Sequence, residues 1–519
     1  MEPAANQAAG ATPSALMVQN ETRDSETSAL KVTATFLRTN WLLVVGISVA
    51  LLAPCFWHQH IAAGDLASHT YNAWLAQLIE QGKAPGLWLA RQWNNVLFDY
   101  SLSAAASVVG LRAAEKIAVA TAVLLFFWGA FALICALTRR MPWFVMPALA
   151  AFAYGWTFEQ GFMNYYLSLG LGFFALALIA RGRGREPLLL FLLVPLIWLA
   201  HPLGSVLVIS AGTYIYLANR FGARAQKFLF VAAIAALVAV HFLLARNFNV
   251  MWNTGPFLRN LLRFNGTDQL ITYGAQYRQV AYAMLVLLVF YAAVEIIQRV
   301  RAHESIGEWW LPLQLYAIAV VAAFLLPRVL YLPEMLGPQV GLLTERLTSV
   351  TAVLALCVVG AARPQRWHLA GLAAVSTVFF FYLYMDTGTL NRMEEQVERY
   401  ADSLPPGSRV VATIWPLPGS RVLIDHFVDR ACIGHCYSYG NYEPSSGQFR
   451  VRARPENGIV AANFDDTDAI ESGTYIVQPQ DLPMFQIFQC QRDLIGLCMR
   501  QLEAGERNGR LGYHPALRH

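Results

Sequence analysis

The chain has 519 residues, of which 56% are hydrophobic and only 14% are charged, whereas an ordinary soluble domain carries about 25% charged residues. This composition excludes an ordinary soluble enzyme and indicates a membrane protein. The formal net charge is +5. Because the basic residues do not gather in one stripe, we expect no nucleic-acid partner.

Residues 1–37 are rich in Ala, Ser, Thr, Gln and Glu and show no apolar periodicity. This composition predicts a disordered cytoplasmic leader. The segment lacks the charged start and the apolar core of a signal peptide. We therefore expect the first membrane span to direct insertion without being cleaved.

Apolar runs long enough to cross a bilayer as helices recur through residues 38–385. Two ambiguities stay open: 97–110 could be an extra short span, and the pair of runs around His201-Pro202 could be one broken element. The pattern predicts a polytopic α-helical membrane domain with about eleven spans, near 39–57, 115–137, 143–158, 163–180, 187–201, 203–218, 228–245, 279–297, 309–330, 346–362 and 367–385.

The links between these runs predict the topology. Basic residues concentrate in every second link, which the positive-inside rule places in the cytoplasm. The N-terminus is then cytoplasmic and the C-terminus extracytoplasmic, as expected for a protein of a bacterial inner membrane; an even number of spans would reverse the tail. The basic residues of these links are Arg139, Arg140, Arg181, Arg183, Arg185, Arg220, Arg224, Lys227, Arg299, Arg301, Arg363 and Arg366.

The first outer loop, 58–114, has the pattern of an amphipathic helix, with Tyr71, Trp74, Leu75, Leu78 and Ile79 along one stripe. We expect this helix to lie on the membrane surface.

Asp65, His69 and Asn72 fall on a separate polar face of that helix. Asp65 has two compatible interpretations. It could cap the helix, or it could act on a substrate, because a charge this close to the membrane is costly unless it is paired or used.

A second carboxylate, Glu159, lies in the next short outer link. Together with Asp65 it could hold a divalent cation such as Mg²⁺ or Mn²⁺, or one of the two could act as a general base. Asn164 and Tyr165 follow and could hydrogen-bond a ligand. The alternatives are a solvated loop glutamate and two packing residues.

Three further residues could meet a lipid-linked substrate at the outer ends of spans. Arg346 begins a late span and could grip a phosphate, unless it pairs with Glu345 or Glu334. Arg328 is a similar candidate, expected at the same cavity. His201 could bind a ligand or simply end a helix.

Composition changes at Asp386, after which helix and strand patterns predict a soluble α/β domain over 386–519. Strands are expected at 408–414, 421–424 and 474–477. In an extracytoplasmic tail Cys432, Cys436, Cys490 and Cys498 would form disulfides. A zinc site is the alternative, although the spacing matches no standard signature.

These features resemble the GT-C superfamily of membrane glycosyltransferases. Asp65 matches the acid of the first outer loop, Glu159 the second acid, and Glu345-Arg346-Leu347 the arginine-bearing start of a late span that meets the lipid phosphate. The resemblance implies a polyprenyl-phosphate-sugar donor, a lipid, glycan or protein acceptor, and membrane lipids as partners.

One departure is that Asp65 is followed by Leu66, whereas many members carry adjacent acids there. Metal dependence and the retention of catalysis therefore stay open. The rival classes are a lipid-linked transporter or flippase and a noncatalytic assembly protein. A transporter would be expected to show repeats or charges in the middle of spans, and neither is evident.

Overall fold

The computed structural model describes most of the chain after the leader. Contacts divide the chain into two compact units, Met1–Ala53 and Pro54–His519, and the first contains helix α2 (Trp41–Leu51). The predicted leader, 1–37, lies outside the described residues. These are 40–182, 186–254, 256, 260, 261, 263–305, 307–332, 339–424, 426–490, 493 and 495–509.

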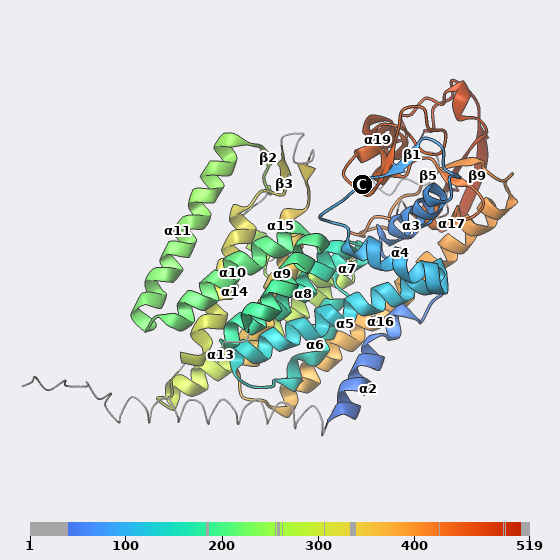
Figure 1. The fold of residues 1–519 in the computed structure, drawn as a ribbon. Helices are drawn as coiled ribbons and strands as arrows, with labels where there is room; N and C mark the ends of the chain where they lie inside the picture. Colours follow the sequence, from blue (N-terminus) through green and yellow to red (C-terminus); the bar gives the residue numbers. More distant parts are fainter. Residues whose placement is uncertain are drawn as a thin grey trace, which may run out of the picture. The chain divides into compact units, whose positions relative to one another are not determined.

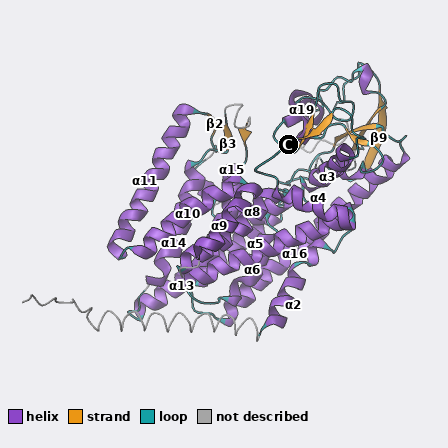
Figure 2. Ribbon diagram, in the orientation of Figure 1, coloured by secondary structure: helices purple, strands orange, loops and turns teal. Residues whose placement is uncertain are grey.

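Among the described residues, eight helices are long and apolar enough to cross a membrane, so the fold agrees with a helical membrane protein (Figures 1 and 2). Each overlaps a predicted span. They are α5 (Leu111–Thr138), α8 (Met163–Arg181), α10 (Pro202–Arg220), α11 (Ala223–Asn247), α13 (Tyr277–Arg301), α14 (Gly307–Leu325), α15 (Leu343–Gly360) and α16 (Arg366–Ser403).

Two other predicted spans are short apolar helices, α2 and α9 (Glu186–Ala200). The run at 97–110, left open as an extra short span, is the short apolar helix α4 (Leu97–Val109). The run predicted at 143–158 is divided into the 3-10 helix η2 (Trp143–Val145), α6 (Met146–Ala153) and α7 (Trp156–Glu159). Tyr154 and Gly155 interrupt it, and Gly155 starts α7 from an extended conformation.

Helix α16 continues through Asp386, where the sequence suggested that the last span ends. Its buried stripe runs on past that residue through Leu390, Met393, Val397 and Ala401. These spacings keep the apolar side chains on one helical face, which packing stabilises. One helix of 38 residues therefore extends well past the predicted end of the last span.

The chain after α16 contains a four-stranded sheet in the order β6-β5-β8-β9. Strand β5 pairs in parallel with β6 and β8, and β8 pairs antiparallel with β9. The strand expected at 408–414 is β5, but 421–424 is not a strand and 474–477 makes only an isolated bridge at Ile476. The elements are β5 (Arg409–Thr413), α17 (Phe427–Ala431), β6 (Tyr437–Ser438), α18 (Tyr442–Ser446), α19 (Phe464–Ser472), η5 (Pro479–Asp481), β8 (Met484–Gln489) and β9 (Leu497–Leu502).

The four cysteines of the tail form two local disulfides in the structure. Cys432 pairs with Cys436 and Cys490 pairs with Cys498. Cys55, Cys135 and Cys357 are free.

Residues 58–114, predicted to be the first outer loop, are joined to the tail. Strand β1 (Leu87–Leu89) pairs antiparallel with β7 (Val451–Ala453). Helix α3 (Leu66–Glu80) packs on α17, and the Tyr71 hydroxyl accepts a hydrogen bond from the Ser438 backbone N–H at 3.0 Å. Tyr71 and Leu75 are fully buried, so these two residues of the apolar stripe pack inside the protein, while Trp74, Leu78 and Ile79 are partly buried.

A small three-stranded sheet links the segments before α13 and α15. It has the antiparallel order β2-β3-β4, with β2 (Asn249–Met251), β3 (Val329–Tyr331) and β4 (Gln339–Val340). The 3-10 helix η3 (Thr267–Leu270) lies close to α13 and α15.

Candidate functional site

A cavity of about 780 Å³ lies where α3, the starts of α8, α10 and α15, and the tail meet. We call it the main cavity. Six of the predicted site residues line it: Asp65, His69, Asn164, Tyr165, His201 and Arg346. The structure therefore brings together residues from four segments that are distant in the sequence.

Asp65 is held by a close backbone contact between the first two outer loops. Its N–H donates to the Gln160 carbonyl at 2.9 Å, and the Gly64 N–H donates to the Glu159 carbonyl at 2.8 Å. Gly161 has a φ of +85°, and a Cβ there would lie 2.3 Å from the Asp65 nitrogen. Only glycine tolerates this backbone conformation at low cost and permits so close an approach.

The Asp65 side chain does not cap α3, although the residue stands at the N-cap position. Its Oδ1 lies 3.9 Å from Nε2 of His426. Burial raises the pKa of Asp65, while the charges of His426, His69 and Arg346 oppose that rise. A buried carboxylate with a raised pKa is suited to accept a proton.

His69 belongs to a polar network beneath Asp65. Its Nδ1 lies 2.7 Å from Asp99 Oδ1 and 3.6 Å from Glu443 Oε1. The amide of Asn164 donates to the other Asp99 oxygen at 2.7 Å. Although burial opposes protonation, the charge and hydrogen bond of Asp99 raise the pKa of His69 to about 9, so His69 is a cation at neutral pH.

Arg346 provides the second charged wall of the main cavity. Its guanidinium carbon lies 4.2 Å from the centre of the Phe162 ring, and Nη1 lies 3.2 Å from His201 Nε2. His201 Nδ1 already accepts from the Leu203 N–H, so Nε2 carries the ring hydrogen in neutral His201 and is a poor acceptor. Arg346 Nε is buried without a hydrogen-bond partner among the described residues. An anion would satisfy these donors.

The charges that line the main cavity favour an anionic ligand. Besides Arg346, Arg452 from β7 and the protonated His69 line it, whereas Asp65 is the one carboxylate among its described lining residues. Apolar residues also line it, including Trp198, Leu203 and Val340 from α9, α10 and β4. The lining thus combines positively charged and apolar side chains.

Glu159 does not line the main cavity, contrary to the expectation that it joins Asp65. Its Oε2 accepts from the Tyr273 hydroxyl at 2.6 Å, and burial raises its pKa to about 8. Glu159 contacts the Asp65 segment through its backbone carbonyl, while its side chain points to Tyr273 and away from the main cavity.

This arrangement is a poor fit for the Mg²⁺ or Mn²⁺ suggested by the sequence. Within the described residues no group of three His, Cys, Asp or Glu side chains could hold a metal ion. The groups whose charges act on Asp65 are His426, His69 and Arg346, which would repel a cation. Hard divalent cations prefer several oxygen ligands.

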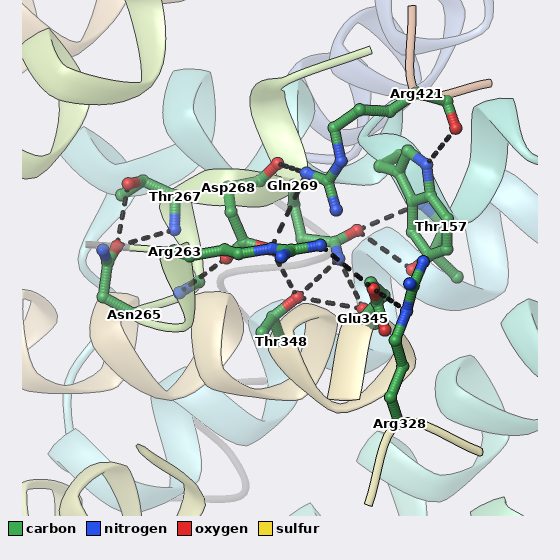
Figure 3. Close-up of polar contacts among 12 residues, drawn as sticks. Thr157, Arg263, Asn265, Thr267, Asp268, Gln269, Arg328, Glu345, Thr348 and Arg421 are labelled. Atoms are coloured by element: carbon green, nitrogen blue, oxygen red, sulfur yellow. Dashed lines mark hydrogen bonds and ion pairs between the residues drawn. The ribbon is translucent and has the colours of Figure 1, made fainter. Parts of the chain in front are cut away.

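Arg328 also lies outside the main cavity, contrary to expectation. Its Nε contacts Glu345 Oε1 at 3.0 Å, and Arg263 reaches the same oxygen at 3.3 Å (Figure 3). Glu345 and Arg346 are consecutive on α15, so their side chains point about 100° apart. Glu345 therefore anchors the arginines on one side while Arg346 faces the cavity, which is also why Glu345 and Arg346 do not pair.

The network in Figure 3 fixes the start of α15. Gln269 accepts from the Thr157 N–H at 3.0 Å and donates to the Glu345 carbonyl at 2.8 Å. Thr348 donates to Asp268 at 2.8 Å, and Arg421 donates to the Asp268 carbonyl at 2.9 Å. These bonds join α7, η3, α15 and the tail, and so position Arg346.

Sequence reasoning missed several residues of the site. Asp99 and Glu443 hold His69, His426 approaches Asp65, and Tyr442 and Arg452 line the cavity. Asp99, an acid in the first outer loop, could have been suspected. The tail residues gave no signal, because their approach depends on tertiary packing.

Comparisons of this chain with protein-family models, with curated proteins and with solved structures found no match. The geometry of the main cavity is therefore the basis for assigning a function.

Proposed function

We propose that the protein is a membrane glycosyltransferase of the GT-C type, which transfers a sugar from a polyprenyl-phosphate donor to a hydroxyl-bearing lipid, glycan or protein. The observation that carries this proposal is that a partly buried carboxylate, Asp65, and an incompletely paired guanidinium, Arg346, line one cavity at the ends of membrane-length helices. The reaction would take place at the outer face of a bacterial inner membrane.

The donor would occupy the main cavity. Its phosphate would accept hydrogen bonds from Arg346, whose buried Nε lacks a partner among the described residues. Its polyprenyl chain would contact the apolar lining residues Trp198, Leu203 and Val340. A hydrogen bond to a charged group contributes about 1.5–3 kcal/mol. Arg452 and protonated His69 add to the positive field.

The chemical step would be displacement at the anomeric carbon. The acceptor oxygen forms a bond to that carbon and gives its proton to the Asp65 carboxylate. The bond between the anomeric carbon and the phosphate oxygen breaks, and its electron pair leaves with the polyprenyl phosphate. Arg346 stabilises the charge that develops on this leaving group.

The test uses the full-length protein in lipid nanodiscs with a panel of polyprenyl-phosphate-linked sugars. Release of polyprenyl phosphate measures the reaction with an added acceptor, and binding of the donor is measured separately. Asp65→Asn should lower the rate by about 10²–10⁴-fold, the usual contribution of a general base, while donor binding is retained. Glu80→Gln, at the exposed far end of α3, is the matched control.

Transfer by Asp65→Asn at the wild-type rate would remove Asp65 from the mechanism. Failure of the folded wild-type protein to bind any donor would instead favour a noncatalytic assembly protein.

A further inference from the structure

A second cavity of about 240 Å³ lies beside the main cavity, within the tail. It opens at the carboxyl ends of the parallel strands β5 and β6, where Thr413 and Ser438 line it. Ligands of open α/β sheets commonly bind at this edge. We call it the sheet-edge pocket.

The two cavities share a wall. His426 lines the sheet-edge pocket, and its Nε2 lies 3.9 Å from Oδ1 of Asp65, which lines the main cavity. The Tyr442 ring, also at the main cavity, lies 5.3 Å from the His426 ring. His426 therefore lies between the sheet-edge pocket and the Asp65 carboxylate, which does not itself line this pocket.

His426 is held in place from inside the tail. Its Nδ1 lies 3.0 Å from Asp429 Oδ2, and the Asn441 amide donates to the same oxygen at 2.9 Å. The Ser438 hydroxyl donates to the other Asp429 oxygen. This network fixes the ring that separates Asp65 from the pocket.

The linings of the two cavities have opposite charge. Asp429 and Glu471 line the sheet-edge pocket, with His426 as its one cationic residue among those described, whereas Arg346 and Arg452 line the main cavity. A phosphate would be repelled by the first and attracted by the second. The pocket also combines apolar walls at Trp415, Leu423 and Ile470 with polar groups at its base, an arrangement that suits the faces and hydroxyls of a sugar ring.

We propose that the sheet-edge pocket binds an uncharged carbohydrate, which is part of the acceptor and packs against His426, the residue between this pocket and Asp65. The role of this carbohydrate as part of the acceptor rests on the function proposed above. The binding of an uncharged sugar in the pocket is independent of that function. His426 is a positioning residue in this proposal. It orients the Asp65 carboxylate through its Nε2, which lies 3.9 Å from Asp65 Oδ1.

The test measures binding to the full-length protein in nanodiscs, without any donor present. The probes are the methyl glycosides of glucose, mannose and galactose, with glucose 1-phosphate as the charged comparison. We expect at least one methyl glycoside to bind and glucose 1-phosphate to bind about tenfold or more weakly, a difference of about 1.4 kcal/mol.

Two variants locate the binding. Trp415→Ala removes an apolar wall and should weaken the glycoside about tenfold, since a stacked aromatic contributes about that much. Glu471→Arg, at an exposed position, should abolish the discrimination against glucose 1-phosphate. Asp468→Arg, also exposed on α19 but outside the pocket, is the matched control and should change neither affinity.

The outcomes separate the two proposals. If no methyl glycoside binds, or if Trp415→Ala and Glu471→Arg both bind the probes like the wild type, the pocket proposal is overturned. If the glycoside binds as expected but no polyprenyl-phosphate sugar is ever transferred, the proposed function fails while the carbohydrate site stands.

Discussion

At the scale of single residues, two arginines that the sequence predicts at the same cavity have different surroundings. Arg346 lines the main cavity with a partnerless buried Nε, whereas Arg328 pairs with Glu345. We expect Arg346→Gln to weaken donor binding by about 10–100-fold, because it removes a charge-assisted hydrogen bond. Equilibrium binding of a polyprenyl-phosphate sugar measures this.

Arg328→Gln is the matched control, since it changes the same side chain outside the cavity. Its donor affinity should stay close to that of the wild type. If both variants lose the same donor affinity, the loss comes from the change in net charge and not from a contact between Arg346 and the phosphate.

The His69–Asp99 pair predicts a pH dependence of stability. The pKa of His69 is about 9 in the folded protein and about 6.5 in an unfolded chain, so the folded state binds more protons between these values. The stabilisation is fully present below about pH 6.5 and is lost as the pH rises through about 9. The midpoint of heat unfolding should therefore fall over this interval.

His69→Gln should have a smaller change in that midpoint between pH 6.5 and 9, the interval set by the pKa of His69. His303→Gln, at an exposed position after α13, serves as the control. A pH profile that is the same in His69→Gln and in the wild type would contradict the assignment. Part of the slope should persist because the neighbouring His426 also has a raised pKa, about 10.

The sequence predicted some of the residues that line the main cavity but also two charged residues that do not line it. Asp65 and Arg346 were identifiable because charges at span ends are costly unless used or paired. Glu159 and Arg328 gave the same signal, yet Tyr273 and Glu345 satisfy them. The direction in which a helix presents a side chain is a tertiary property, which one sequence does not reveal.

At the scale of elements, the contact between the first two outer loops positions Asp65. Gly161→Ala should destabilise the protein, because the left-handed conformation alone costs a side chain about 1–2 kcal/mol and the new Cβ would meet the Asp65 nitrogen. It should also lower transfer activity by displacing Asp65. Heat unfolding and the transfer assay measure the two effects.

Gly182→Ala separates strain from displacement. Gly182 also has a positive φ, +58°, but a Cβ there meets nothing within 4 Å. This variant should lose a similar amount of stability from strain and keep its activity. If Gly161→Ala is as active as Gly182→Ala, the loop contact does not position Asp65.

The elements themselves were largely predictable, since long apolar runs become helices in a membrane. The exceptions have local causes. Gly155 interrupts the run at 143–158, and the buried stripe after Asp386 extends α16 although the overall composition has become polar. The sequence composition therefore marked a change of surroundings and not the end of a helix.

At the scale of the whole molecule, the pairing of β1 with β7 requires the first outer loop and the tail to lie on the same side of the membrane. Single-cysteine variants at exposed Glu80 and Asp468 should both react with a membrane-impermeant maleimide in intact cells. Cysteine at exposed Arg220 or Arg301, at the opposite ends of spans, should react only after permeabilisation.

If the Glu80→Cys variant is labelled in intact cells and the Asp468→Cys variant is not, the first loop and the tail do not lie on the same side of the membrane. Labelling of all four positions in intact cells would contradict the membrane crossing of α10 and α13. The native free cysteines give a low background, because Cys55 and Cys357 are buried and Cys135 is partly buried.

Helix α16 has a mechanical consequence. Its 38 residues extend about 57 Å, nearly twice the roughly 30 Å bilayer core. Its far end carries the sheet through the bond from the Tyr400 hydroxyl to the Leu497 carbonyl at 2.8 Å. The sheet therefore contacts the same long helix that is apolar enough to cross the membrane. A glycosyltransferase of the type proposed above would then select its substrates by the width of the space between the spans and the tail.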